Sequence, residues 1–169
     1  MELEDAIRSR RTHKAYRPEP ISREVLEELF ELAGWAPNHH LTRPWRFRVV
    51  GPRALEALKE AAGPEAAVKL DRAPTLVVCT ATGSGEEPAD TEDLLATGCA
   101  AYIVLLAAHG RGLAGYWRTP AVLREQAGRD AVGLADDERF VGLLYLGHPV
   151  QERRPPERDP EAFGATFLD

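Results

Sequence analysis

The chain has 169 residues, with 21 Lys and Arg against 27 Asp and Glu, and a formal net charge of −6. This balance excludes a general basic surface for nucleic acid or anionic membranes, so any anion site must be local. A hydrophobic content of 44% with 28% charged residues excludes the disordered and fibrous classes. The length suits one domain over residues 1–169.

The chain starts MELEDAIRSRR, with acids where a secretory signal has a positive segment and an apolar run, so we expect a cytoplasmic protein. The longest apolar run, residues 94–108, is shorter than the roughly 20 residues of a membrane span and predicts a buried helix. Cys79 and Cys99 lie in apolar surroundings at a spacing that matches no redox or zinc motif. We expect two buried thiols.

The order of predicted elements is helix, helix, strand, helix, strand, long helix, strand, helix, strand. Apolar spacing from Leu3 predicts the first helix, and Ser22 as N-cap predicts a second helix that ends near Gly34. Strands are expected at 45–50, 75–80, 112–117 and 140–146, a short helix after Pro52, and another helix start at Thr119 and Pro120. This order predicts an α/β or α+β sandwich around a sheet.

The C-terminal segment differs in composition from the rest of the chain. From His148 onward it is charged and rich in proline, with Phe163, Phe167 and Leu168 as apolar anchors. Such a segment cannot make a core of its own. We therefore expect an arm that lies on another surface, such as a partner subunit.

A stretch near the N-terminus, residues 8–17, reads RSRRTHKAYR and carries five cations in ten residues. Arg8 has Glu4 and Asp5 one helical turn earlier, which predicts a solvated surface pair. Arg10 follows apolar residues at the same spacing, and it shares their face if the helix continues that far. No local carboxylate therefore neutralises Arg10.

The cluster of Arg10, Arg11, Thr12 and Lys14 needs a source of negative charge. An arginine buried without a partner costs several kcal/mol, so Arg10 should meet an anion from elsewhere. One such partner is a distant Asp or Glu, and the other is a phosphate, which the forked guanidinium binds well. The clustering favours a phosphate or another anionic ligand.

The usual signatures of nucleotide, hydrolase and metal sites are absent from the sequence. There is no GxGxxG after a strand, no phosphate-binding GxxxxGK and no GxSxG elbow. No metal spacing is formed by His39, His40, His109 and His148. An enzyme whose chemistry belongs to a redox cofactor has anion-binding residues and aromatic walls without a catalytic side-chain pair.

Two sets of residues have two interpretations each. The tryptophans flank expected loops, where they either wall a ligand or pack in the core; they are Trp35, Trp45 and Trp117. The glycines either terminate a helix before a strand or approach a ligand; they are Gly110, Gly112 and Gly115.

Three blocks in order along the chain resemble the nitroreductase family of flavin-dependent enzymes, in particular its short NAD(P)H nitroreductases. The blocks are RRTHKAYRPEPI, ELAGWAPNHHLTRPWRFRVV, and GLAGYWRTP with VGLLYLGHP, and the dissimilar region is residues 51–92. The resemblance implies an α+β sandwich with a central mixed β-sheet flanked by helices. It also implies an obligate homodimer that holds FMN at the subunit interface and a C-terminal arm that reaches the partner subunit.

The resemblance assigns roles by position. The implied FMN contacts are Arg10, Arg11, Thr12, Lys14, Trp35, His39, Trp117, Arg118 and Thr119. The implied NAD(P)H segment is Ala107, Ala108, His109, Gly110, Arg111 and Gly112. Arg153 and Arg154 lie near the position of a further phosphate-binding cation. Leu41 and Arg43 depart from the Asn and Gln of longer members, and no catalytic side chain or metal is implied.

The implied activity is a ping-pong reaction in which NADH or NADPH reduces FMN, leaves, and is replaced by a nitroaromatic, a quinone or a similar small acceptor. Reduced flavin gathers negative charge, which Arg10 or Lys14 would stabilise. The alternatives are a flavin-dependent dehalogenase or flavin-consuming enzyme of the same superfamily, or a non-catalytic nucleotide- or anion-binding regulator. No nucleic-acid or membrane partner is expected.

Overall fold

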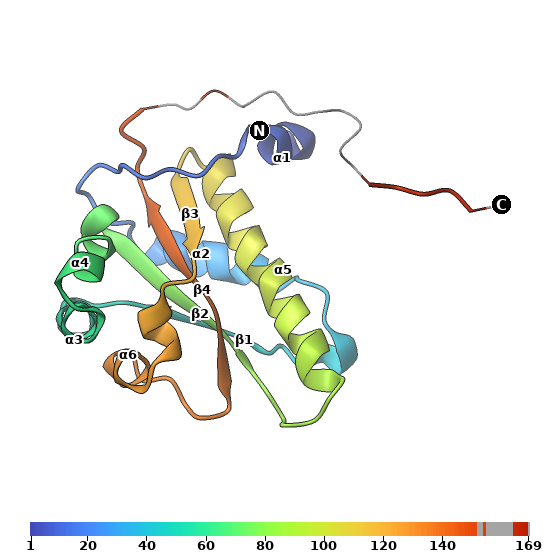
Figure 1. Ribbon diagram of the computed structural model, residues 1–169. Helices are drawn as coiled ribbons and strands as arrows, with labels where there is room; N and C mark the ends of the chain where they lie inside the picture. Colours follow the sequence, from blue (N-terminus) through green and yellow to red (C-terminus); the bar gives the residue numbers. More distant parts are fainter. Residues whose placement is uncertain (152–153, 155–163, 169) are drawn as a thin grey trace.

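The computed structural model describes residues 1–151, 154 and 164–168. Its centre is a four-stranded sheet in the order β1-β2-β4-β3 (Figure 1). The strands are β1 (Trp45–Val49), β2 (Thr75–Thr82), β3 (Ala114–Arg118) and β4 (Glu138–Gly147). Each of the predicted strands is present, and β2 and β4 are longer than the apolar runs that predicted them.

All three strand pairs are antiparallel. The chain passes from β2 through a long helix to β3, so these two strands run in the same direction, but β4 lies between them and runs the other way. The parallel pairing within the described residues is an isolated bridge between Thr12 and Gly115. The α+β class is confirmed, whereas the expected mixed sheet is wrong for the described strands.

Helices cover both faces of the sheet (Figure 1). They are α1 (Leu3–Ser9), α2 (Arg23–Ala33), α3 (Pro52–Ala62), α4 (Pro64–Ala67), α5 (Ala89–Gly110) and α6 (Gln126–Ala131). Short 3-10 turns lie at η1 (His39–Leu41), η2 (Leu70–Arg72) and η3 (Ala121–Arg124). One core cluster packs α2 and α5 on one face, and a second packs residues of α3, η2 and η3 on the other.

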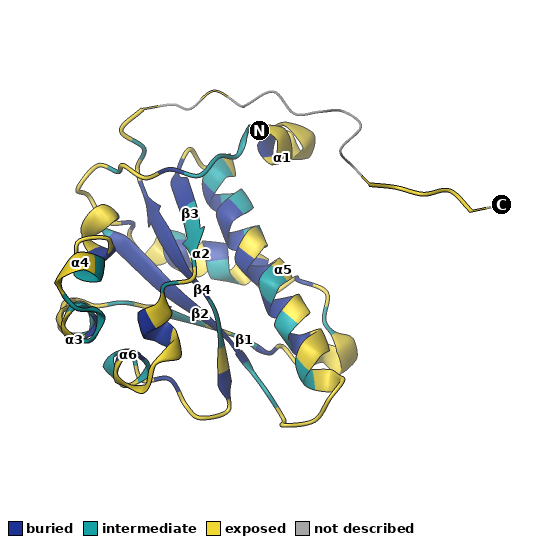
Figure 2. Ribbon diagram, in the orientation of Figure 1, coloured by how far each residue is buried: buried dark blue, intermediate teal, exposed yellow. Residues whose placement is uncertain are grey.

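The two inner strands alternate between these clusters, because successive side chains of a strand point to opposite faces. Val77 and Leu144 face α2 and α5, whereas Val78 and Leu143 lie in the other cluster. Figure 2 shows the inner strands buried along most of their length. The continuous apolar runs in the sequence follow from this burial on both faces.

The predicted start of α2 is confirmed. The Ser22 hydroxyl accepts a hydrogen bond from the Val25 N–H at 3.4 Å. Ile21 and Leu26, on either side of the cap, are both buried in the same core cluster, as a hydrophobic staple requires. These contacts fix the direction in which the chain enters the layer beside α5.

The long helix α5 extends beyond the apolar run 94–108 at both ends, and after its acidic first turns it has apolar residues on all sides. Its inner face is buried, but its outward face leaves Leu95, Cys99 and Tyr102 exposed. Cys79 is buried as expected, whereas Cys99 is not, because it lies on this outward face. Among the described residues, α5 is the one helix long and apolar enough to cross a membrane, and 44% of its most apolar window is buried inside the fold.

A partly buried ion pair joins the edge strand β1 to β4. The Arg48 guanidinium donates to the Glu138 carboxylate at 2.8 Å, and only 5% of the Glu138 side chain is exposed. Within the described part of the chain, Oε2 of this carboxylate has no hydrogen-bond partner. Arg48 is therefore the counter-ion of a carboxylate that has little access to water.

The end of the chain lies away from the sheet (Figure 1). Arg154 is exposed, and Phe167 and Leu168 are 91% and 90% exposed. Phe163 and Arg153 lie outside the described residues. Two large apolar side chains thus lack a packing surface within the described chain.

Candidate functional site

The basic stretch begins where α1 ends. Arg8 forms the expected exposed pair with Glu4 at 3.3 Å. Arg10 follows the last helical residue and has an extended backbone, with φ −54° and ψ 129°. The helix ends at Ser9, so the condition under which Arg10 would share its apolar face is not met, and Ile7 on that face is 48% exposed.

Arg10 instead reaches the outward face of α5. Its Cζ lies 5.9 Å from the centre of the Tyr102 ring, within the range of a cation–π contact. Its Nε is buried without a hydrogen-bond partner, and no described carboxylate forms an ion pair with it. Arg10 is therefore a half-buried cation whose charge no described acid balances.

The other residues of the cluster differ in their surroundings. Arg11 folds back and donates to the carbonyl oxygens of Arg8 and Arg10, which caps the C-terminal end of α1. Thr12 pairs with Gly115, and Lys14 is exposed. Arg11 thus positions the turn that carries Arg10.

The stretch is held against β3 by backbone contacts. The His13 N–H donates to the Gly115 carbonyl at 3.2 Å. A Cβ on Gly115 would lie 2.7 Å from a methyl carbon of Leu105, so β3 packs closely against α5 at this glycine. The basic stretch is consequently fixed beside the C-terminal end of α5.

That end of α5 contains the segment assigned to NAD(P)H. The Gly112 N–H donates to the His109 carbonyl and the Leu113 N–H to the Ala108 carbonyl, which is a Schellman motif with Gly112 at φ +76°. Arg111 pairs with Glu28 of α2 at 3.1 Å. These contacts favour helix termination as the role of the glycines.

A second contact joins this end of α5 to α1. His109 Nε2 lies 2.7 Å from the Ser9 hydroxyl. Burial, followed by the charges of Arg10 and Arg11, lowers the pKa of His109. A cavity of about 310 Å³ opens beside this contact, lined by Met1, Ser9, His13, His109, Gly112, Leu113 and Pro149. His109 therefore belongs with the basic stretch, although nothing in the sequence links the two.

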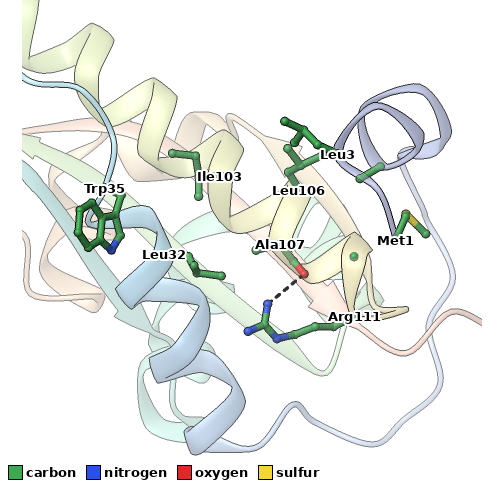
Figure 3. A pocket seen from close by; sticks show the side chains of 10 residues that line it. Met1, Leu3, Leu32, Trp35, Ile103, Leu106, Ala107 and Arg111 are labelled. Carbon is green, nitrogen blue, oxygen red and sulfur yellow. Dashed lines mark hydrogen bonds between the residues drawn. The ribbon is translucent and has the colours of Figure 1, made fainter.

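An apolar cavity of about 550 Å³ lies between α1, α2 and α5 (Figure 3). Its lining is Met1, Leu3, Ala6, Leu32, Trp35, Ile103, Leu106, Ala107, Gly110 and Arg111. Trp35 is 83% exposed at one side of it. Of the two interpretations of Trp35, core packing is wrong, because the indole lies on the surface.

The loop that carries His39 lies at the other end of α5. His39 Nδ1 is 2.6 Å from the Glu92 carboxylate, and the Thr42 hydroxyl donates to Asp93 at 2.6 Å. The His39 ring also stacks on His40 with centroids 3.9 Å apart. The loop is thus attached to the first turns of α5.

The same loop holds non-glycine residues in the left-handed region. His40, Leu41 and Arg43 have φ of 49°, 55° and 48°. The Asn38 side chain holds this shape, because its amide donates to the Ala36 carbonyl and accepts from the Arg43 N–H. Such backbone strain persists only where the surrounding contacts over-determine it, and it clusters at functional sites.

The late segment of the implied FMN site divides between the two faces of the sheet. Trp117 faces α5, where its indole N–H donates to the Val141 carbonyl at 3.2 Å. Arg118 points to the opposite face and donates to the Tyr145 hydroxyl at 3.0 Å. Thr119 follows the strand and is exposed. The Arg118 side chain is therefore not brought to Arg10.

The remaining residues form two groups at opposite ends of α5. His109 marks the end near Arg10, and Glu92 marks the end near His39. His109 and Glu92 are 17 residues apart, which is about 25 Å along the helix. The Arg10 guanidinium itself lies over Tyr102, ten residues from Glu92, so about 15 Å of α5 separates the two groups at their nearest points.

Comparisons with known proteins extend over most of the chain. The model of the Nitroreductase family matches residues 7–148. "Putative NAD(P)H nitroreductase YfhC" of Bacillus subtilis is 28% identical and aligns with 93% of this chain and 91% of its own. A nitroreductase-like protein from Bacillus cereus has a TM-score of 0.89 at 21% identity, over 100% and 97% of the two chains. The structure of "a putative nitroreductase in complex with fmn" from Desulfovibrio desulfuricans has a TM-score of 0.80 at 26% identity, over 98% of both chains.

Proposed function

The chain belongs to the nitroreductase family, and from this premise we propose that it is an FMN-dependent oxidoreductase that uses NADH or NADPH to reduce nitroaromatic, quinone or similar small acceptors. The name of the Bacillus subtilis relative supports the nicotinamide reductant, and the FMN complex of the Desulfovibrio protein supports the cofactor. The observation that carries the proposal is Arg10, a half-buried cation without a described counter-ion.

The residues present fit the phosphate end of FMN. The orphaned Nε of Arg10 and the absence of a described carboxylate beside it leave a guanidinium suited to a phosphate oxygen. Thr12 and the exposed Lys14 lie on the same stretch and extend the contact toward the rest of the cofactor. Arg118, whose side chain lies across the sheet, is left out of this assignment.

A second copy of the chain supplies the other half of the proposed site. A twofold axis across the middle of α5 sets this helix antiparallel to its copy. The axis pairs Leu95 with the second copy's Leu106 and Cys99 with the second copy's Tyr102, which covers the exposed outward face. It also brings the Arg10 end of one chain to the His39 end of the other.

The C-terminal arm has a place in the same assembly. Phe167 and Leu168 are almost fully exposed in the single chain, which is costly for side chains of this size. We assign them to the surface of the second copy. The arm then adds to the interface that covers α5.

When bound, FMN supplies reversible hydride transfer, so that the nicotinamide and the acceptor use one site in turn. The chain's own residues bind FMN and orient it. Arg10 and Lys14 stabilise negative charge on FMN. Trp35 and the apolar cavity keep water from one side of the site. The strained loop sets the position of His39.

The test is binding and turnover with purified protein. FMN is titrated and followed by its fluorescence, and oxidation of NADH or NADPH is then measured with a nitroaromatic or a quinone. We expect turnover that needs FMN, weaker binding of riboflavin, which lacks the phosphate, and a dimeric mass by light scattering. A protein that binds riboflavin as tightly as FMN would contradict the role of Arg10, and one that oxidises no reduced nicotinamide with FMN bound would contradict the enzyme.

A further inference from the structure

We propose that His109 is a further, proton-dependent cation beside Arg10 in the phosphate site, so that binding of FMN takes up a proton. The inference rests on the proposed function. It adds His109 to the phosphate site, whereas the resemblance placed His109 in the NAD(P)H segment. It begins from the contact between His109 and Ser9, at 2.7 Å, directly before the two arginines.

The hydrogen bonds around Ser9 determine which imidazole nitrogen is available. The Ser9 hydroxyl lies 2.5 Å from the Asp5 carbonyl and 3.8 Å from the Met1 sulfur, so its single hydrogen goes to the carbonyl. His109 Nε2 must then donate to the Ser9 oxygen. The proton that charges the ring therefore adds at Nδ1, and the contact with Ser9 persists in both protonation states.

The charges around His109 oppose its protonation in the absence of an anion. Arg10 and Arg11 lower its pKa, in addition to the larger effect of burial. The neighbouring cations Arg8 and Arg111 are each paired with a glutamate. His13 and the N-terminal residue line the same cavity, and Pro149 adds no charge. No carboxylate of the described residues is hydrogen-bonded to His109.

A phosphate bound at Arg10 offsets the largest electrostatic contribution to this lowered pKa. It weakens the repulsion between Arg10 and a proton on His109, while the C-terminal end of α5 continues to favour a cation there. The bound form of the site therefore holds the proton more tightly than the free form.

The direction of the pH effect follows from linkage. Because the complex binds more protons than the free protein at His109, FMN binds more tightly as pH falls through the range in which His109 titrates. A rise of one unit in the pKa of His109 on binding gives about a tenfold gain in affinity. The second ionisation of the phosphate, near pH 6, has the opposite effect and is the same in any variant.

The experiment compares the wild type with His109→Gln, which keeps a donor for Ser9 but cannot be charged. FMN affinity is measured by flavin fluorescence between about pH 5.5 and 8.5, which spans the ordinary titration range of histidine. The matched control is His148→Gln, at an exposed histidine. We expect the ratio of wild-type to His109→Gln affinity to rise by roughly tenfold toward low pH, and the control to follow the wild type.

Calorimetry in two buffers of different ionisation enthalpy gives a second readout. We expect net proton uptake when the wild type binds FMN, and less uptake when His109→Gln binds it. With riboflavin, the wild type and His109→Gln should take up the same number of protons. Parallel pH profiles of the wild type and His109→Gln would overturn this inference while leaving the proposed function intact. A wild-type protein that binds no FMN at any pH would overturn both.

Discussion

Removal of the Arg10 side chain should separate cofactor binding from folding. Arg10 makes no described ion pair, and its contact with the Tyr102 ring is worth about 0.5–1 kcal/mol. Arg10→Ala should therefore lower the free energy of unfolding by less than about 1 kcal/mol in the absence of FMN. The same change removes the guanidinium that we assign to the phosphate.

The expected loss of affinity is much larger. A hydrogen bond to a charged group contributes about 1.5–3 kcal/mol, and each 1.4 kcal/mol is about a factor of ten in affinity. FMN should consequently bind roughly 10- to 100-fold more weakly to Arg10→Ala. Riboflavin affinity should change far less, because riboflavin carries no phosphate.

The assay is fluorescence titration with FMN and with riboflavin, alongside urea unfolding of the free protein. Arg8→Ala is the matched control, since Arg8 lies one residue before Ser9 and its side chain pairs with Glu4 in solvent. That pair is worth about 0.3–0.5 kcal/mol, and its loss should leave FMN affinity within about twofold. Equal FMN affinity in Arg10→Ala and the wild type would refute the assignment of the phosphate.

Three further changes test the packing and the assembly. Gly142→Ala places a Cβ 2.1 Å from the Trp117 indole nitrogen, so it should lower the free energy of unfolding in urea by about 1–3 kcal/mol. Gly110→Ala, with open space around it, should not destabilise the protein. Equal stability of the two variants would contradict the close packing of Trp117 on Gly142. Arg48→Ala leaves the Glu138 carboxylate without its counter-ion and should lower the free energy of unfolding by about 3 kcal/mol. The double variant Arg48→Met with Glu138→Leu should recover most of this stability. Additive losses in the double variant would argue against a coupled pair. Tyr102→Glu puts a carboxylate on the outward face of α5 and should give a monomer by light scattering. Val68→Glu, at another exposed apolar residue, should remain a dimer. A dimeric Tyr102→Glu would exclude the proposed interface.

The sequence predicted local structure well, because local signals determine it. Ser22 caps α2 as expected, and the apolar runs mark β2 and β4. The order of strands was not predictable, since neither periodicity nor turn chemistry states that β4 inserts between β2 and β3. For the same reason the sequence did not show that each strand pair is antiparallel.

The site was predictable in part. The lack of a local carboxylate for Arg10 was visible in the spacing of the N-terminal segment, and the structure retains this cation without a described acid. The sequence could also have predicted that Trp117 and Arg118 lie on opposite faces of the sheet, because adjacent strand residues point in opposite directions. The spacing of Leu95, Cys99, Tyr102 and Leu106 likewise marks one face of a helix.

The contact of Ser9 with His109 could not have been predicted. The two residues are 100 positions apart, and no motif joins them. Only the packing of α1 against the end of α5 brings them together. The terminal turn of α5, which holds His109 there, depends on Gly112 at a positive φ.

The central claim is that this chain performs flavin chemistry with a reduced nicotinamide. The most direct measurement is the absorbance of the FMN-loaded protein when it is mixed with NADH or NADPH without oxygen, followed by an excess of a quinone or a nitroaromatic. We expect the yellow colour to be lost with the nicotinamide and to return with the acceptor. A flavin spectrum that neither reduced nicotinamide changes would contradict it.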